Sequence, residues 1–193
     1  KTFYFLLFAG TSQSTISTAL VFHQSSVIAS KGLDPSFSAA IFGVMAPTAL
    51  FGNFLAGFLV DKFPNRFVLA SAQLILGIAM LMALMMSSPV QAITYGALLG
   101  LAGGMASITN AVIWPNYFGR KHLGSIRGIV TTAMVASAAL GPWPFGILFD
   151  VTGTYTWAIL LGLALPITCA ICAIAAIPPK PNTSSLNDAE NQE

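Results

Sequence analysis

The charged residues of this chain all lie at the ends of six long apolar stretches or outside them. Eight basic and six acidic residues occur in 193. A helix needs about 20 apolar residues to cross the ~30 Å hydrocarbon core of a bilayer, and each stretch is roughly that long or longer. The charged fraction is 7%, whereas a soluble domain carries about 25%. The pattern predicts an all-α, multi-pass membrane protein.

The six stretches predict six transmembrane helices. Backbone polar groups inside lipid must be bonded within the span, as in a helix, and the strict alternation of barrel strands is absent from the sequence. Pro115 is expected to end the fourth span. The expected spans are residues 3–27, 37–60, 67–87, 92–114, 128–149 and 155–177. Residues 1–177 are therefore expected to form one six-helix bundle, followed by a polar, disordered cytoplasmic tail at 178–193.

The distribution of Lys and Arg predicts the orientation. These residues accumulate on the cytoplasmic side of a membrane protein. Seven of the eight lie at the two chain ends or in the loops after the second and fourth spans, and only Lys31 lies in the other loops. Both termini are therefore expected in the cytoplasm, with the protein in the plasma membrane or an inner cell membrane. The cations form no cluster, so no nucleic-acid partner is expected.

An intramembrane enzyme and a channel are the alternatives to a transporter. The sequence lacks the characteristic motifs of both. The sequence has no Gly-x-Ser-Gly of an intramembrane serine protease and no His-Glu-x-x-His of a zinc protease. It also has no Asn-Pro-Ala pair and no potassium-filter sequence. Cys169 and Cys172 stand among Ala and Ile, which favours two small packed residues over a metal or redox site. No cofactor and no metal are expected.

Polar residues within the spans are the candidates for a substrate cavity, because such groups prefer the bundle interior or a wet cavity. Ser and Thr can instead bond their own backbone or another helix. His23 is the titratable residue well inside a span, so it is a candidate proton site, with a structural role as the alternative. The cavity candidates are Gln13, Ser17, Thr18, Asn53, Ser107 and Asn110, with Thr131 and Thr132 as weaker ones.

Glycine and proline predict packing and bending. Gly96, Gly100 and Gly104 recur every four residues and form a stripe that lets another helix approach closely, with a hinge as a further hypothesis. Four prolines lie within spans, where each removes a helical hydrogen bond and tends to kink the helix. They are Pro47, Pro142, Pro144 and Pro166.

A short motif repeats in the two halves of the chain. The second span ends in Gly57-x-x-x-Asp61 and the fifth ends in Gly146-x-x-x-Asp150, each at the exit of the middle helix of a three-helix set. The two sets have opposite orientations because each contains an odd number of spans. The match favours an inverted three-plus-three repeat, a plan that recurs in secondary transporters.

Several motifs resemble the major facilitator superfamily of transporters. The segment Gly57-x-x-x-Asp61-Lys62-x-x-x-Arg66 resembles its signature loop in the second-half copy, although that pattern has a Gly where this chain has Pro64 or Asn65. Residues 117–128 resemble the loop before the penultimate helix in the monocarboxylate and oxalate/formate branch. Residues 141–155 resemble the helix and turn that follow, and Phe22-His23-Gln24 resembles the end of the seventh helix.

The resemblance implies one bundle of a twelve-helix transporter, with this chain as helices seven to twelve. The expected partners are the lipid bilayer, an N-terminal six-helix half that this chain does not contain, a small-molecule substrate and a coupled proton or ion; a six-helix homodimer is the alternative. The implied function is secondary active transport, as symporter or antiporter, of a small solute such as a monocarboxylate. The residues expected in a conformational gate are Gly57, Asp61, Lys62, Arg66, Arg120 and Arg127.

Overall fold

The computed structural model describes residues 2–178, and every regular element in this range is an α-helix. Lys1 and the predicted tail after Pro178 lie outside the described residues. The elements are α1 Thr2–Phe22, α2 Gln24–Ser30, α3 Phe37–Lys62, α4 Asn65–Met85, α5 Pro89–Phe118, α6 Leu123–Leu140, α7 Pro142–Thr152, α8 Thr156–Gly162 and α9 Ala164–Ala175.

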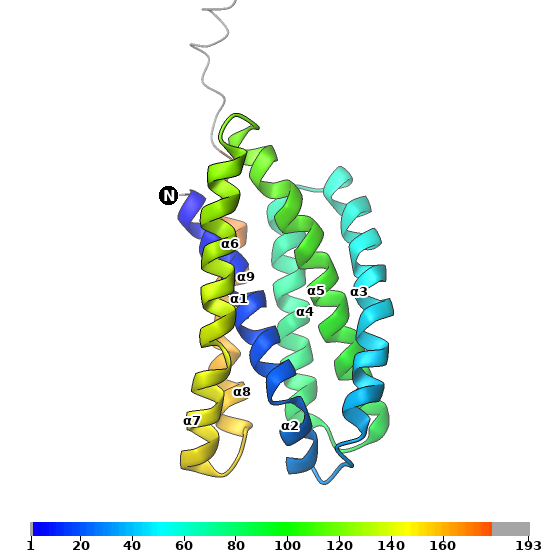
Figure 1. The fold of residues 1–193 in the computed structure, drawn as a ribbon. Helices are drawn as coiled ribbons and strands as arrows, with labels where there is room; N and C mark the ends of the chain where they lie inside the picture. Colours follow the sequence, from blue (N-terminus) through cyan, green and yellow to red (C-terminus); the bar gives the residue numbers. More distant parts are fainter. Residues whose placement is uncertain (1, 179–193) are drawn as a thin grey trace, which may run out of the picture.

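Six segments of the described chain are long and apolar enough to cross a membrane, which confirms the predicted number. Four are the single helices α1, α3, α4 and α5, and the other two combine α6 with α7 and α8 with α9. The hydroxyl of Thr2 donates a hydrogen bond of 2.9 Å to the carbonyl of Ile177. The two ends of the described chain therefore meet at one end of the bundle, as an even number of spans requires (Figure 1).

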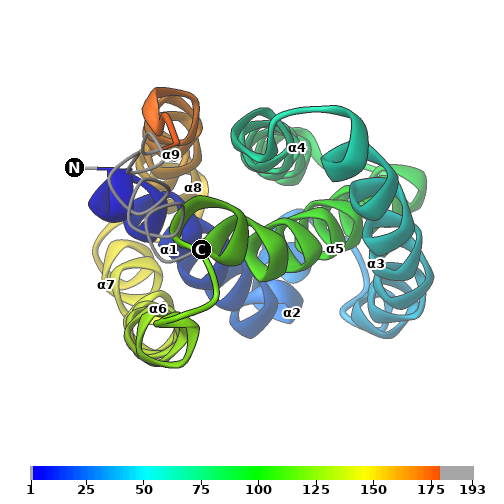
Figure 2. The same cartoon turned by 90° about the horizontal axis from the view of Figure 1, so that it is seen from above.

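The helix contacts are reciprocal between the two halves of the chain. Helices α3 and α4 of the first three spans pack on α5 of the last three, and α6 and α9 of the last three pack on α1 of the first three. Helices α4 and α9 pack on each other and form the back of the bundle in the view along the helices (Figure 2). An inverted repeat of three spans predicts this exchange, because the first helix of each set then packs against the other two of the opposite set.

Three predicted spans are interrupted, and two of the interruptions lie at or near prolines for which a kink was predicted. The first breaks at His23 between α1 and α2, the fifth at Gly141 between α6 and α7, and the sixth at Leu163 between α8 and α9. Pro142 opens α7, and Pro166 leaves the carbonyl of Gly162 without its usual donor, so two breaks follow from missing backbone N–H groups. Pro47 lies inside an uninterrupted α3.

The prediction that Pro115 ends the fourth span is wrong. Helix α5 continues through Pro115 to Phe118 and ends at Gly119, whose φ of 71° an L residue rarely adopts. The helix also starts earlier than expected, because Pro89 takes the first helical position and the Ser88 hydroxyl accepts the backbone N–H of Gln91. Helix α6 likewise begins five residues before the predicted span, so Arg127 lies in a helix rather than in a loop.

A buried polar contact that the sequence analysis missed joins α1 to α4. The hydroxyl of Ser12 donates to the side-chain oxygen of Gln73 at 2.8 Å, and the amide nitrogen of Gln73 donates to the carbonyl of Ala9 at 2.8 Å. Gln73 and Ser12 are both fully buried. This contact fixes the back of α1 against α4, so the other side of α1 faces the opposite surface of the bundle.

Candidate functional site

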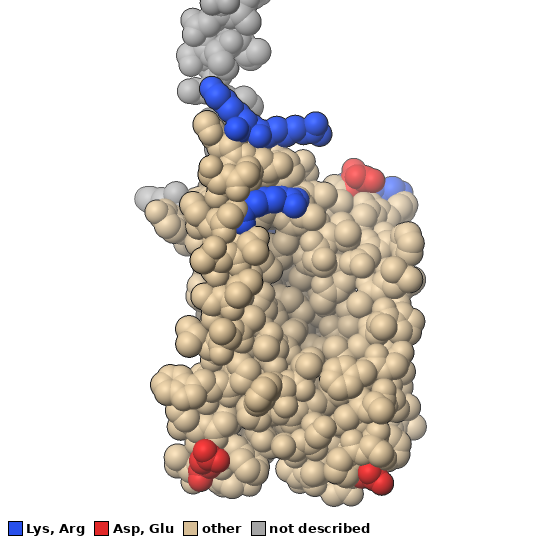
Figure 3. Space-filling model, in the orientation of Figure 1, with Lys and Arg blue, Asp and Glu red and all other residues tan. Residues whose placement is uncertain are grey.

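The surface opposite α4 and α9 is concave. Helix α6 stands on one side of it, α3 and α5 stand on the other, and α1 lies between them (Figures 1 and 2). The space-filling view shows a hollow in this face, with apolar and uncharged residues around its middle and cations at one end (Figure 3). Only 6% of the most apolar part of the α6–α7 span is buried, against 56% for α4. Helix α6 is therefore an edge of an open groove.

One cavity in the groove, here named the α3 cavity, lies where α1, α3 and α5 meet. Its volume is ≈ 380 Å³. Pockets for small ligands have volumes of about 300–1,000 Å³. Gln13 and Ser17 supply its polar groups, and the Gln13 amide nitrogen donates to the Ser17 hydroxyl at 2.7 Å. The remaining lining residues are Phe42, Met45, Ala46, Ala49, Leu99, Gly100 and Gly103. The Gln13 side-chain oxygen has no hydrogen-bond partner within residues 2–178.

A second cavity, here named the α6 cavity, lies between α5 and α6 and has a volume of ≈ 250 Å³. Both side-chain atoms of Asn110 and the indole nitrogen of Trp114 have no hydrogen-bond partner in the described part of the chain. Trp114 is 1% exposed. The lining residues are Ser107, Asn110, Ala111, Trp114, Arg127, Val130, Thr131 and Met134. The two cavities follow each other along α5, since Gln13 faces Gly103 and Asn110 faces Gly10 across the α1–α5 contact.

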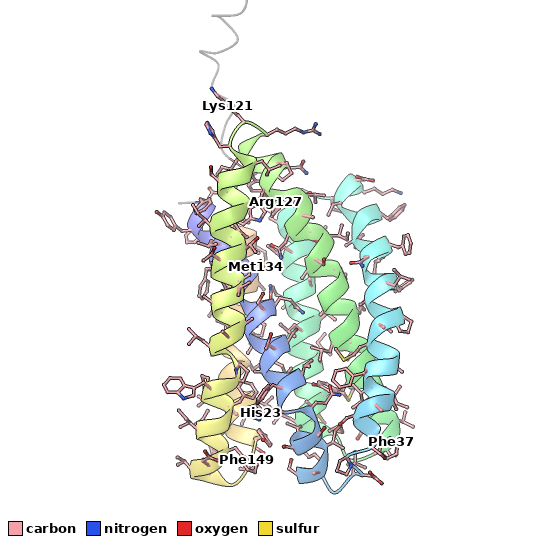
Figure 4. The ribbon with its side chains drawn as sticks, viewed as in Figure 1. His23, Phe37, Lys121, Arg127, Met134 and Phe149 are labelled. Carbon is pink, nitrogen blue, oxygen red and sulfur yellow. The ribbon has the colours of Figure 1, made fainter. Side chains whose placement is uncertain are left out.

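Arg127 is the charged residue of the groove. Its guanidinium reaches from α6 to α5 and donates to the carbonyl of Ala111 at 2.8 Å (Figure 4). None of the residues that line the two cavities is acidic. The groove therefore offers a cation and uncharged polar groups but no carboxylate.

The structure groups four of the six cavity candidates in pairs. Gln13 and Ser17 line the α3 cavity, whereas Ser107 and Asn110 line the α6 cavity together with Thr131. Thr18 and Asn53 line neither cavity, and Thr132 is exposed outside them. Trp114 and Arg127 also line the α6 cavity, although neither was predicted as a cavity residue. A Trp one helical turn beyond Asn110 was the signal available, because residues four apart share a helix face.

The glycine stripe forms the contact between α5 and α3. A Cβ at Gly100 would overlap the Met45 carbonyl, one at Gly104 would overlap the Ala49 carbonyl, and one at Gly96 would lie 2.7 Å from the Ile41 side chain. The two backbones therefore approach as closely as small residues permit. This contact forms a rigid wall on the α3 side of the groove.

Five of the six expected gate residues lie toward the end of the bundle where the two ends of the described chain meet. Asp61 is exposed, the Lys62 ammonium lies 4.1 Å from the centre of the Phe58 ring, and the Arg66 guanidinium lies 4.8 Å from that of Phe67. Gly57 borders open space, and Arg120 is exposed in the turn before α6. Arg127 is separate from this group, because its side chain lies in the groove.

His23 lies at the break between α1 and α2 and contacts the break between α6 and α7. Its Nε2 is 3.1 Å from the carbonyl of Pro142, and its Nδ1 is 3.2 Å from the hydroxyl of Tyr155. A neutral imidazole satisfies both contacts when Nε2–H donates to the carbonyl and the tyrosine hydroxyl donates to Nδ1. His23 lines neither cavity.

Two comparisons with known proteins bear on this arrangement. The family model of the Major Facilitator Superfamily matches residues 2–193, which is nearly the whole chain. No curated protein matches the chain.

Proposed function

The chain belongs to the Major Facilitator Superfamily of membrane transporters, and we propose that it forms one six-helix half of a secondary active transporter working by alternating access. In such proteins, substrates bind near the bilayer midplane between two bundles, and one bundle rocks against the other. The observation that supports the proposal is the open groove, which is formed by α1, α3, α5 and α6 and is lined by uncharged polar groups and one cation.

The groove has the properties of one side of a translocation path. Within the described residues, both amide atoms of Asn110 and the side-chain oxygen of Gln13 lack a hydrogen-bond partner, and a buried unpaired polar group costs about 1–3 kcal/mol. A second six-helix bundle facing the groove would enclose these groups with a solute between the halves. The tight α3–α5 contact and the buried Ser12–Gln73 contact on the opposite side suit a bundle that moves as a body.

We further propose a small organic anion, such as a monocarboxylate, as the solute. The resemblance of residues 117–128 to the monocarboxylate and oxalate/formate branch favours this class, and the lack of an acidic residue in either cavity agrees with it. Symport or antiport with a proton or another ion would drive the transport, and His23 is the candidate for a proton site in the described bundle.

The orientation proposed for the transporter follows the cation distribution. The bundle end that carries Asp61, Lys62, Arg66 and Arg120 would face the cytoplasm of a plasma or inner cell membrane, with both chain termini on that side. Contacts of this loop with the second bundle would close the cytoplasmic side and break when it opens.

Cysteine accessibility tests alternating access directly. Ser107→Cys and Ala46→Cys place thiols in the two cavities, in a protein whose Cys169 and Cys172 are replaced by Ala. A membrane-impermeant maleimide should label both sites. Addition of a transported carboxylate should change the labelling rates in opposite directions for reagent applied from the two sides of the membrane. Labelling rates that never change with any transported solute would contradict alternating access.

A further inference from the structure

The contact between Arg127 and Ala111 has a specific cause in the sequence of α5. The carbonyl of Ala111 would normally accept the backbone N–H of residue 115, but residue 115 is proline and has none. Arg127 supplies the missing donor from the neighbouring helix at 2.8 Å. The proline therefore creates an acceptor that holds the guanidinium beside the α6 cavity.

The contact leaves most of the guanidinium free for a ligand. Arginine has five N–H donors, and one of them reaches Ala111. Among residues 2–178, the indole N–H of Trp114 has no hydrogen-bond partner although the side chain is 1% exposed, and the amide of Asn110 has none either. Phe3 and Phe118 pack against the Trp114 ring at centroid distances of 5.5 and 6.0 Å, so the indole is held in place.

The remaining walls select for size and charge. Val130, Met134 and Ala111 give the cavity an apolar side, and Ser107 and Thr131 add hydroxyl groups. No lining residue is acidic, so the cavity has no counter-charge for a cationic solute. A planar carboxylate matches the two-pronged geometry of a guanidinium, and a short apolar chain matches the opposite wall.

We propose that the α6 cavity is a binding site for a small monocarboxylate, in which Arg127 binds the carboxylate and Trp114 and Asn110 donate to it, while Pro115 positions Arg127 through the carbonyl of Ala111. The site deepens the proposed transport function and rests on it. Arg127 lies toward the bundle end that carries Lys121, well above His23 at the other end (Figure 4). The α6 cavity thus lies nearer that end of the groove than the α3 cavity does.

Binding of propionate to the purified full-length protein in lipid nanodiscs, measured by saturation-transfer NMR, tests the site without requiring transport. Propionamide has the same shape without the charge and should bind at least tenfold more weakly. Arg127→Gln should weaken propionate binding about tenfold or more, because hydrogen bonds to a charged group are lost. Arg127→Lys should restore part of the affinity. Lys121→Gln, which removes an exposed cation at the same end of the bundle, should change it less than twofold.

Pro115→Ala separates ligand binding from helix support. Alanine returns a backbone N–H to the Ala111 carbonyl, so Arg127 is no longer needed there. In this background, Arg127→Gln should still weaken propionate binding about tenfold. Recovery of normal affinity in the double variant would overturn the proposal, because Arg127 would then serve the helix alone. So would equal binding of propionate and propionamide.

The transport proposal can fail independently. A protein that binds propionate through Arg127 but moves no solute in proteoliposomes would retain the site and lose the transporter assignment. A protein that transports solutes while Arg127→Gln leaves both propionate binding and the preference for anions unchanged would retain transport and lose the site.

Discussion

Side-chain amides lie on both sides of α1, and their environments differ. On the α4 side, Gln73 is fully buried and bonds Ser12 and the Ala9 carbonyl through both ends of its amide. On the groove side, both amide atoms of Asn110 and the oxygen of Gln13 lack partners within the described residues. The same chemical group thus completes the scaffold on one side and is left available on the other. Amides that stabilise a membrane bundle are paired, whereas unpaired amides indicate where a solute or another bundle contacts it.

The largest loss of stability is expected at the close backbone contact between α3 and α5. Gly104→Ala places a methyl group against the carbonyl of Ala49 and should destabilise the bundle by about 3 kcal/mol, because neither backbone can move freely. Thermal unfolding in detergent measures the loss. Gly103→Ala is the matched control one residue away, where the new methyl would meet the Gln13 amide at an ordinary 3.5 Å. Equal destabilisation by the two variants would show that the α3–α5 contact is not the tight wall described above.

The second-largest loss of stability is expected at the paired amide of Gln73. Gln73→Leu removes both interhelical hydrogen bonds of the side chain and should cost about 1 kcal/mol, because such bonds between membrane helices contribute on average about 0.6 kcal/mol each. A double-mutant cycle with Ser12→Ala should show less than additive losses, because both variants remove one shared contact. Additive losses would mean that the Ser12–Gln73 bond contributes nothing to stability.

The unpaired amide provides the opposite expectation. Asn110→Leu removes an amide with no partner within residues 2–178, so the bundle should lose no stability and should gain up to about 1–3 kcal/mol. Uptake of the transported solute into proteoliposomes should fall at least several-fold at unchanged protein level. If Asn110→Leu destabilised the bundle as strongly as Gln73→Leu does, the distinction between the two sides of α1 would be lost.

The smallest change in stability is expected at the exposed end of α3. Asp61→Asn leaves an exposed, unpacked side chain and should not alter unfolding or membrane insertion, yet transport should fall if this loop closes the cytoplasmic side. Asp150→Asn, at the equivalent exit of the other three-helix set, is the control at the opposite end of the bundle and should leave uptake unchanged. Normal uptake by Asp61→Asn would rule out the gate.

Hydropathy and charge predicted the six spans because transfer of side chains into lipid dominates the energy of each segment. The breaks at His23, Gly141 and Leu163 could not be located in this way, since they depend on single backbone hydrogen bonds within apolar stretches. At Pro115 the error is the opposite one, because the sequence predicts a helix end that the structure does not have. The missing N–H of Pro115 predicts the end of a helix, but a guanidinium twelve residues later replaces the donor and the helix continues.

The candidate site could be predicted only in part. Gln13 and Asn110 stood out because amides are rare inside lipid-facing segments, and the structure places both along the groove. Gln73 is likewise an amide inside an apolar stretch, but it holds α4 to α1 instead of lining the groove. The sequence does not show this difference, because it depends on the partners of Gln73 on α1. Arg127 was assigned to a loop because a charge beside an apolar run normally marks a boundary, whereas the start of α6 lies four residues earlier.

The imidazole of His23 has a mechanical consequence. It joins two interrupted spans at their points of interruption, through Pro142 on one side and Tyr155 beyond it. Because the side chain at one helix break is bonded to the backbone at the other, bending at one break strains the contact unless the other break bends with it. The angle between α1 and α2 is therefore coupled to the angle between α6 and α7 through one side chain.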